Sequence, residues 1–118
     1  MDGEPRILRT KLSPEDLLTL AEATFGDMVK LVVDVDRGLL AAGGMLHADA
    51  EALLTEDGAP TDALWGANYF PARAVGERLE YTALINIRPA RGNRGQEIAD
   101  PSTRERVREV VERLVGPA

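Results

Sequence analysis

Apolar and polar residues alternate regularly from position 28 to position 35, and this pattern predicts a β-strand. The odd-numbered residues of the strand form an apolar face, whereas the even-numbered face is partly polar. Residues 36–38 (Asp-Arg-Gly) follow as a turn, because glycine adopts a positive φ at little cost. Residues 39–42 then return as a second strand, so positions 28–42 are predicted to form a β-hairpin.

Three further stretches are predicted to be strands. Residues 64–70 contain the only tryptophan and end at a proline. Residues 79–87 alternate apolar with polar positions until the next proline, which indicates a long, half-buried strand. Residues 7–8 form a short edge strand near the amino terminus. We expect the odd-numbered faces of residues 29–35 and 79–87 to form the core.

Two segments carry the signals that start a helix. Ser13 is a suitable N-cap, and Pro14 follows at the first helical position. Gly26 is well placed to end this helix in a left-handed turn. Asp100 and the proline after it repeat the start signal near the carboxyl end. Apolar residues at helical spacing then predict the buried face of the second helix, at Val107, Val110, Val111 and Leu114.

Residues 45–55 fit two structures. As a strand, the segment would project His47, Asp49 and Glu51 from one face. As a helix, it would form an apolar stripe, made of Leu46, Ala50, Leu53 and Leu54. The alanines favour the helix, whereas the strict alternation and the glycines on both sides favour a short strand. We expect the strand and keep the helix as the alternative.

Together these elements predict one α+β domain spanning residues 1–118. Its single, mostly antiparallel sheet has four or five strands, and an amino-terminal and a carboxyl-terminal helix pack on it. Each predicted helix has one apolar stripe, which must be buried against a face of the sheet. The length of 118 residues is sufficient for one hydrophobic core.

Composition narrows the classes of function. The net charge of −6 argues against nucleic acid as a partner, because phosphate contacts need a basic excess. The absence of cysteine excludes a disulfide scaffold, a thiol nucleophile and a cysteine-bound metal. No apolar run approaches the roughly 20 residues that span a membrane, and the first nine residues do not form an apolar leader. We therefore expect a cytoplasmic protein without a membrane partner.

The first candidate site is the segment from His47, the only histidine, to Glu51. On a strand, an imidazole and two carboxylates on one face supply ligands for a divalent metal or partners for acid–base chemistry. His47 and Asp49 are therefore candidate catalytic residues, with Glu51 as an orienting group or a further ligand. Solvated strand faces also alternate polar residues, so an ordinary surface is the alternative. No cofactor is predicted, although a divalent metal is compatible with this pattern.

The second candidate site lies in the polar, arginine- and glycine-rich stretch at residues 86–94. Arginine presents forked donors that suit phosphate or carboxylate, and glycine lets the backbone approach an anion. Arg88 and Arg94 would bind the anion, and the side chains that would orient it are Asn86, Asn93 and Asn68. Asn68 qualifies because an amide in an apolar strand needs partners when it is buried. The alternative is a flexible loop whose arginines pair with nearby acids.

Several three- to six-residue segments, in this order, resemble a group of short bacterial proteins known only as a domain of unknown function. The segments are 25–30 (Phe-Gly-Asp-Met-Val-Lys), 44–49 (Gly-Met-Leu-His-Ala-Asp), 64–68 (Leu-Trp-Gly-Ala-Asn) and 85–89 (Ile-Asn-Ile-Arg-Pro), followed by Gly-Asn-Arg at 92–94. The resemblance covers roughly residues 7 to 115. It implies a single domain, and it implies no activity, cofactor or site residue.

Three hypotheses follow from these patterns. The first is a binding module for a small anionic or phosphorylated ligand, which uses residues 86–94. The second is a hydrolase or metal-dependent enzyme, with His47 as acid–base group or ligand. The third is a structural or interaction protein that forms a homo-oligomer through an exposed strand edge. The sequence lacks a P-loop, a dinucleotide-binding glycine motif and a G-x-S-x-G nucleophile motif.

Overall fold

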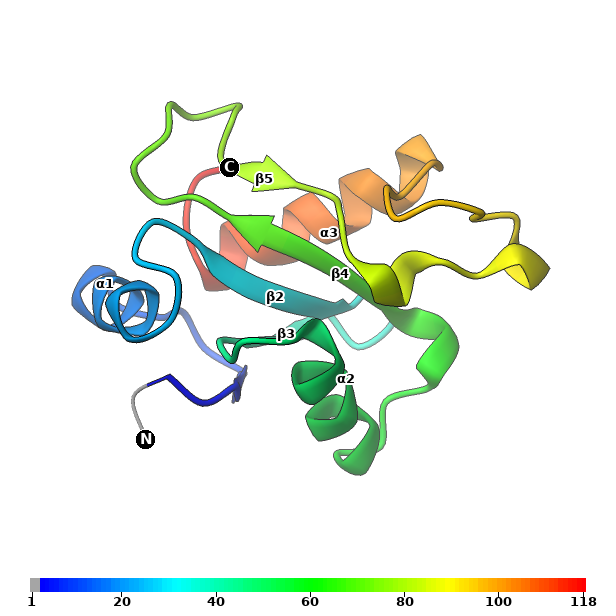
Figure 1. The fold of residues 1–118 in the computed structure, drawn as a ribbon, viewed down its shortest axis with the longest axis horizontal. Helices are drawn as coiled ribbons and strands as arrows, with labels where there is room; N and C mark the ends of the chain where they lie inside the picture. Colours follow the sequence, from blue (N-terminus) through cyan, green and yellow to red (C-terminus); the bar gives the residue numbers. More distant parts are fainter. Residues whose placement is uncertain (1–2) are drawn as a thin grey trace.

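The computed structural model describes residues 3–118, and within that range it contains three α-helices and one five-stranded sheet (Figure 1). The strands are β1 (Arg6–Leu8), β2 (Val29–Asp34), β3 (Leu39–Ala42), β4 (Leu64–Tyr69) and β5 (Leu79–Glu80). They are ordered β1-β3-β2-β4-β5, and every neighbouring pair is antiparallel. The predicted α+β class, the hairpin at 28–42 and the strand at 64–70 are confirmed.

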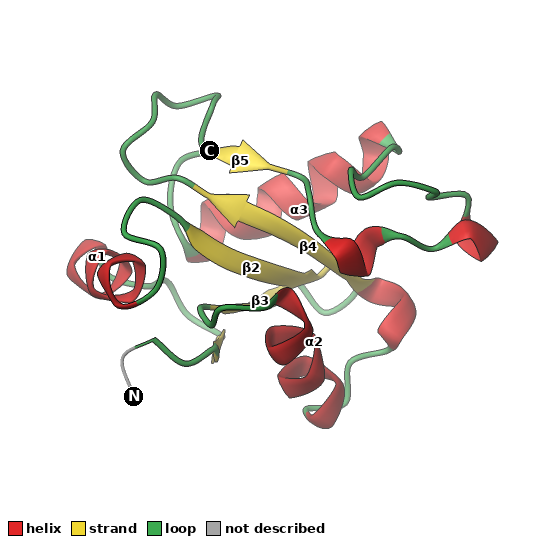
Figure 2. Ribbon diagram, in the orientation of Figure 1, coloured by secondary structure: helices red, strands yellow, loops and turns green. Residues whose placement is uncertain are grey.

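Helices cover both faces of the sheet, as Figure 2 shows. They are α1 (Pro14–Ala23), α2 (His47–Glu56) and α3 (Pro101–Leu114). Helices α1 and α3 pack on the face that carries the odd-numbered residues of β2, as predicted. Helix α2 packs on the opposite face, against Val32 and Leu64, and forms a second, smaller core there. Within residues 3–118, no helix is long and apolar enough to cross a membrane.

The starts of the three helices differ in their capping. The Ser13 hydroxyl accepts a hydrogen bond from the backbone N–H of Asp16 at 3.1 Å, and Asp100 caps α3 in the same way. Both predicted caps are thereby confirmed. Helix α2 begins after Leu46, which has no side-chain acceptor to cap the first turn. The N–H groups at the start of α2 therefore lack the partner that the other two helices have.

The predicted strand at residues 45–55 is wrong, because most of this segment forms α2. Its buried residues are His47, Ala50 and Leu54, which follow helical spacing. The physical reason lies in the sheet, whose second face is apolar at Val32 and must be covered. A helix with a small alanine at the contact covers that face, whereas an edge strand would leave it exposed.

The predicted long strand at residues 79–87 is also wrong, since β5 ends at Glu80. Leu84–Asn86 instead form a turn of 3₁₀-helix. The Asn86 side chain accepts from the N–H of Gly66 at 2.8 Å and donates to its carbonyl at 3.0 Å, which replaces strand pairing with β4. Ala83 packs directly on Gly66, where an added Cβ would lie 2.4 Å from the Ala83 Cβ. The expected odd-numbered core therefore fails at Ile87, which is exposed.

Candidate functional site

An open pocket of about 480 Å³ lies between the first turn of α2, the adjoining ends of β2 and β4, and residues 82–96. Its volume is within the range of small-molecule sites, which is roughly 300–1,000 Å³. The polar residues that line it are Lys30, His47, Asn68, Thr82 and Gln96. The rest of the lining is apolar and comes mainly from α2 and the turn at 83–85. A concave apolar site with a few convergent polar groups is typical of ligand-binding pockets.

Lys30 and Asn68 form the floor of the pocket. They are direct partners in the register of β2 and β4, so their side chains are neighbours on the face that α2 covers. The Lys30 ammonium lies 5.2 Å from the centre of the Phe25 ring. Lys30 is half-buried and forms no ion pair with residues 3–118. The pocket therefore holds a positive charge without a counterion from the described chain.

Asn68 leaves one polar atom unsatisfied. Its side chain is 9% exposed, and Nδ2 donates to the Thr82 carbonyl at 3.3 Å. Its Oδ1 is buried and has no hydrogen-bond partner. The orientation of the amide follows from Thr82, because a carbonyl oxygen accepts only from the nitrogen. Buried polar atoms are almost always bonded, so this oxygen marks a position where a donor is missing.

His47 lies above the sheet and is held by the backbone of β4. Its Nε2 lies 2.9 Å from the Ala67 carbonyl oxygen, so Nε2 carries the proton and, in the neutral ring, Nδ1 keeps the lone pair. Burial lowers the pKa of His47; the Ala67 carbonyl opposes this effect, the Lys30 charge adds to it, and Asn68 weakly opposes it. Asn68 lies beside the ring, yet no hydrogen bond of normal geometry joins the two side chains. The imidazole is therefore neutral at pH 7.

The first turn of α2 has unbonded backbone donors on two residues that line the pocket. His47 and Ala48 line the pocket, and their N–H groups form no hydrogen bond with residues 3–118. The amino terminus of a helix carries a partial positive charge from the aligned peptide dipoles. This end of α2 and the Lys30 ammonium therefore bring two sources of positive potential to one pocket.

Asn86 and Asn93, which were predicted to orient a ligand, form hydrogen bonds within the chain. Asn86 is fully buried and bonded to the backbone of Gly66 and Gln96. Asn93 donates to the Asn86 carbonyl at 2.7 Å and accepts from the N–H of Ala99 at 2.9 Å. These bonds hold the irregular segment after β5 against β4, and that segment forms one wall of the pocket. Both amides are used inside the protein and are not available to a ligand.

The arginines of the predicted anion site are placed elsewhere. Arg88 forms an ion pair with Glu51 at 3.0 Å, donates to the Thr61 carbonyl at 2.8 Å and lies over the Trp65 ring. The two polar stretches singled out in the sequence therefore meet, but their contact neutralises Arg88. Arg94 is exposed and forms no ion pair with any residue between 3 and 118. Neither arginine lines the pocket.

The expected common face of His47, Asp49 and Glu51 does not exist, because α2 turns about 100° per residue. Asp49 is exposed and lines a separate hollow beside Met45. Among residues 3–118, no group of three or more histidine, cysteine or acidic side chains is arranged to hold a metal ion. Of the residues predicted from the sequence, the pocket brings together only His47 and Asn68.

Sequence reasoning missed Lys30, Thr82 and Gln96. Lys30 lies on the even-numbered, partly polar face of the strand predicted at 28–35, and no partner for that face was predicted; in the structure α2 covers it. One signal was available, because a single lysine interrupts an otherwise apolar stretch of strand. Its pairing with Asn68 depends on the register of β2 and β4, and no local pattern encodes that register.

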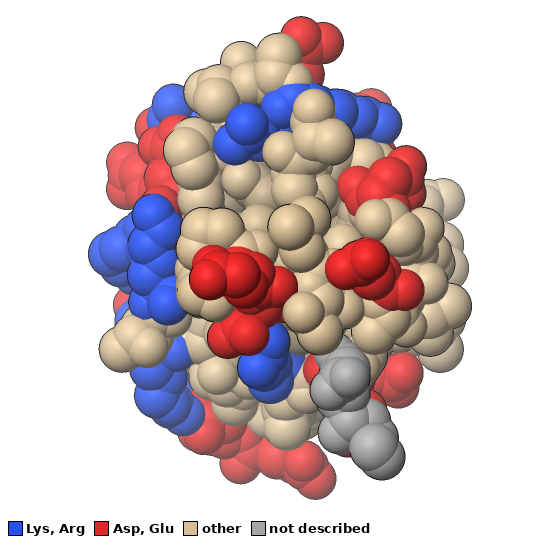
Figure 3. All heavy atoms as spheres, turned by 90° about the vertical axis from the view of Figure 1, so that its left-hand side faces the viewer, with Lys and Arg blue, Asp and Glu red and all other residues tan. Residues whose placement is uncertain are grey.

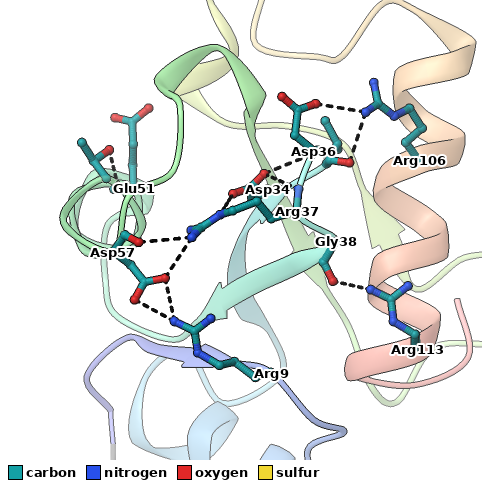
Figure 4. Close-up of polar contacts among 11 residues, drawn as sticks. Arg9, Asp34, Asp36, Arg37, Gly38, Glu51, Asp57, Arg106 and Arg113 are labelled. Atoms are coloured by element: carbon teal, nitrogen blue, oxygen red, sulfur yellow. Dashed lines mark hydrogen bonds and ion pairs between the residues drawn. The ribbon is translucent and has the colours of Figure 1, made fainter.

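A second polar cluster lies at the other end of β2, on the same face of the sheet (Figure 4). Asp34 is fully buried, and its Oδ1 accepts from the N–H groups of Asp36 and Arg37, both at 3.0 Å. Its Oδ2 accepts from Nε of Arg37 at 2.6 Å. Arg37 also pairs with Asp57, which Arg9 binds through both carboxylate oxygens. Every oxygen of Asp34 has a partner, so this cluster holds the hairpin turn, α2 and the segment after β1 together.

The face viewed in Figure 3 carries basic and acidic side chains together, with uncharged surface between them. The ion pairs along α3 are of the same kind, since Arg108 contacts both Glu105 and Glu112. Mixed charges of this type are typical of an ordinary solvated surface. The Lys30 charge in the pocket, which has no counterion among residues 3–118, therefore differs from these paired surface charges.

A family model described as a protein of unknown function (DUF5674) matches residues 6–114. No curated protein and no solved structure matches the chain. The matched range includes all five strands and all three helices, and it therefore contains both walls and the floor of the pocket. The chain belongs to this family of proteins of unknown function, DUF5674.

Proposed function

We propose that this protein is a small-molecule-binding domain and that its ligand occupies the pocket between α2 and residues 82–96. The observation that carries the proposal is the buried, unpartnered Oδ1 of Asn68 in the pocket floor. An unsatisfied buried oxygen costs roughly 1–3 kcal/mol, so the folded chain bears a cost that a bound donor would remove once the Asn68 amide turns towards it. Lys30 adds a positive charge that has no counterion among residues 3–118.

A ligand in this pocket lies away from the arginine-rich stretch at residues 86–94. Arg88 is neutralised by Glu51, and the amides of Asn86 and Asn93 are bonded within the loop. The stretch instead supports the wall of the pocket, because the two buried asparagines hold residues 82–98 in place. Its contribution to binding is therefore structural.

The test is a screen of small organic molecules by ¹H–¹⁵N NMR on the full chain. Ligands are expected to shift the backbone signals of His47, Ala48 and Asn68 before those of other residues. The variant Asn68→Leu, which keeps the side-chain volume and removes the polar atoms, should weaken binding at least tenfold. Arg94→Ala is the control and should bind as the wild type does. The proposal fails if no molecule shifts the pocket signals, or if Arg94→Ala is the variant that loses binding.

A second candidate function is catalysis in the same pocket, with His47 as the general base. The specific observation in its favour is a buried, neutral imidazole whose orientation is held by the Ala67 carbonyl. The variant His47→Gln keeps a donor for that carbonyl and removes the basic lone pair. Turnover of a bound ester that is present in the wild type and absent in His47→Gln, with equal binding in both, would establish this role. Equal turnover in the two proteins would exclude it.

A further inference from the structure

The charge of the pocket sets the charge of its ligand. Among the described residues, Lys30 is the single charged side chain in the lining, and His47 is neutral at pH 7 because of its burial. The unbonded N–H groups of His47 and Ala48 add the partial charge of a helix start, while the carboxylate of Asp49 lines a different hollow. One full positive charge with two N–H donors matches a carboxylate. A phosphate dianion would bring more negative charge than the lining compensates.

The buried oxygen of Asn68 sets a second requirement. Asn68 is cross-strand partner to Lys30, so a group held by the ammonium lies within reach of the amide. The unpartnered Oδ1 calls for a hydrogen-bond donor close to the carboxylate of the ligand. An ammonium at that position would lie beside the Lys30 charge and be repelled by it. A hydroxyl provides the donor without the charge.

The body of the ligand meets an apolar surface. Leu46, which immediately precedes α2, is 60% exposed, and Leu84 on the facing turn is 69% exposed, although both line the pocket. Ala83 and Ile85 continue the apolar lining towards the sheet. Covering these side chains with an aliphatic group stabilises the complex by about 25 cal/mol for each Å² removed from water.

We infer that the ligand is a small aliphatic monocarboxylic acid with a hydroxyl beside the carboxylate, that is, a 2-hydroxy acid. This inference rests on the proposed function. The carboxylate binds Lys30 and the first-turn N–H groups of α2. The hydroxyl donates to Oδ1 of Asn68, which is closed to solvent in the free protein and is reached when the amide turns towards the pocket. The aliphatic chain lies between Leu46 and Leu84.

Isothermal titration calorimetry on the full chain tests the inference with four matched probes. They are 2-hydroxy-4-methylpentanoate, 4-methylpentanoate, leucine and 2-hydroxy-4-methylpentanamide. The hydroxy acid should bind most tightly. Loss of the hydroxyl should weaken binding about fivefold, as for one hydrogen bond, and the neutral amide should bind more than tenfold more weakly. Leucine should also bind more weakly, because its ammonium faces Lys30.

The two lysines of the chain provide a matched pair of variants. Lys30→Met keeps the length of the side chain and should abolish the preference for the acid over the amide. Lys11→Met, on the surface away from the pocket, should leave that preference unchanged. The inference is overturned if the hydroxy acid does not bind, if 4-methylpentanoate, the amide or leucine binds equally well, or if both lysine variants behave alike. Pocket shifts produced by other molecules in the NMR screen would then still support the proposed function.

Discussion

The two ends of β2 carry polar groups on the same buried face of the sheet, and the two clusters differ in how their hydrogen bonds are completed. At the Asp34 end, both carboxylate oxygens are bonded, and the chain of ion pairs continues through Arg37 to Asp57 and Arg9 (Figure 4). At the Lys30 end, the charge has no counterion among residues 3–118, and Oδ1 of Asn68 has no donor.

The difference separates polar groups that stabilise the fold from polar groups that await a partner. A buried group with all its hydrogen bonds made holds neighbouring elements in one arrangement. A buried group without a partner destabilises the free protein and is retained where something else completes it. The comparison therefore predicts opposite effects of substitution at the two ends: a loss of stability at Asp34 and a gain at Asn68.

The largest expected effect on stability is at the Asp34 end of β2, where every hydrogen bond is made. Asp34→Ala removes the acceptor for two backbone N–H groups and for the Arg37 guanidinium, and hydrogen bonds to a charged group each contribute about 1.5–3 kcal/mol. We expect the free energy of unfolding to fall by about 3 kcal/mol in urea denaturation. Asp36→Ala, at an exposed ion pair in the same turn, should cost less than about 0.5 kcal/mol. Equal losses in both variants would contradict the structural role of Asp34.

The second effect concerns the wall that closes the pocket. Gly66→Ala would place a Cβ 2.4 Å from the Cβ of Ala83, so the turn at 83–86 must move off the sheet. Overpacking of this kind costs about 1–3 kcal/mol. The change should also displace the NMR signals of Asn68, because the pocket opens. Gly95→Ala is the control, since nothing lies within 4 Å of its added Cβ. A destabilising Gly95→Ala, or a neutral Gly66→Ala, would refute this account.

The third effect has the opposite sign. Asn68→Leu replaces the unsatisfied amide with an apolar group of similar size, and the weak bond to the Thr82 carbonyl is lost with it. Because an unpaired buried oxygen costs roughly 1–3 kcal/mol, we expect a net gain of about 1 kcal/mol in the unfolding free energy of the free protein. Thermal and urea denaturation without ligand measure it. A loss of stability would mean that Asn68 supports the fold, and the contrast with Asp34 would disappear.

The regular elements were predictable because their signals are local. The caps at Ser13 and Asp100 and the glycine turn at 36–38 each depend on a few adjacent residues. The strand predicted at 79–87 failed because Asn86 bonds the backbone of Gly66, a residue 20 positions earlier in the chain. A period of two in the sequence describes residue types and does not reveal such a competitor.

The candidate site was only half predictable, for a related reason. His47 and Asn68 stood out by residue type, as the single histidine and as an amide within an apolar strand. The strand assigned to residues 45–55 placed His47 with two carboxylates, whereas α2 turns it towards the sheet. Lys30 joins the site through the register of β2 with β4, which depends on contacts that are distant in the sequence.

The smallest expected effect is the pH dependence of stability that comes from His47, beside the Lys30 end of β2. Burial lowers its pKa below the ordinary value of 6.5. The Lys30 charge adds to this effect, whereas the Ala67 carbonyl and Asn68 oppose it. The unfolded chain therefore takes up a proton before the folded chain does as the pH falls. Stability should be constant above about pH 6.5 and decline below it, until the folded-state pKa is reached, by at most about 1.4 kcal/mol per pH unit.

His47→Gln isolates this contribution, because it keeps a donor for the Ala67 carbonyl and cannot be protonated. The wild type should lose stability relative to the variant between pH 6.5 and pH 5, as urea denaturation at each pH would measure. Asp57 and Asp100 also have lowered pKa values, held down by hydrogen bonds from Arg9 and Thr103, but they are present in both proteins and cancel in the difference.

A ligand that binds only the folded pocket should lose affinity over the same range if its binding requires the neutral ring. Parallel pH profiles for the two proteins would mean that His47 is as accessible to protons in the folded chain as in the unfolded one. The Lys30 end of β2 would then be more open to water than the burial of Asn68 indicates.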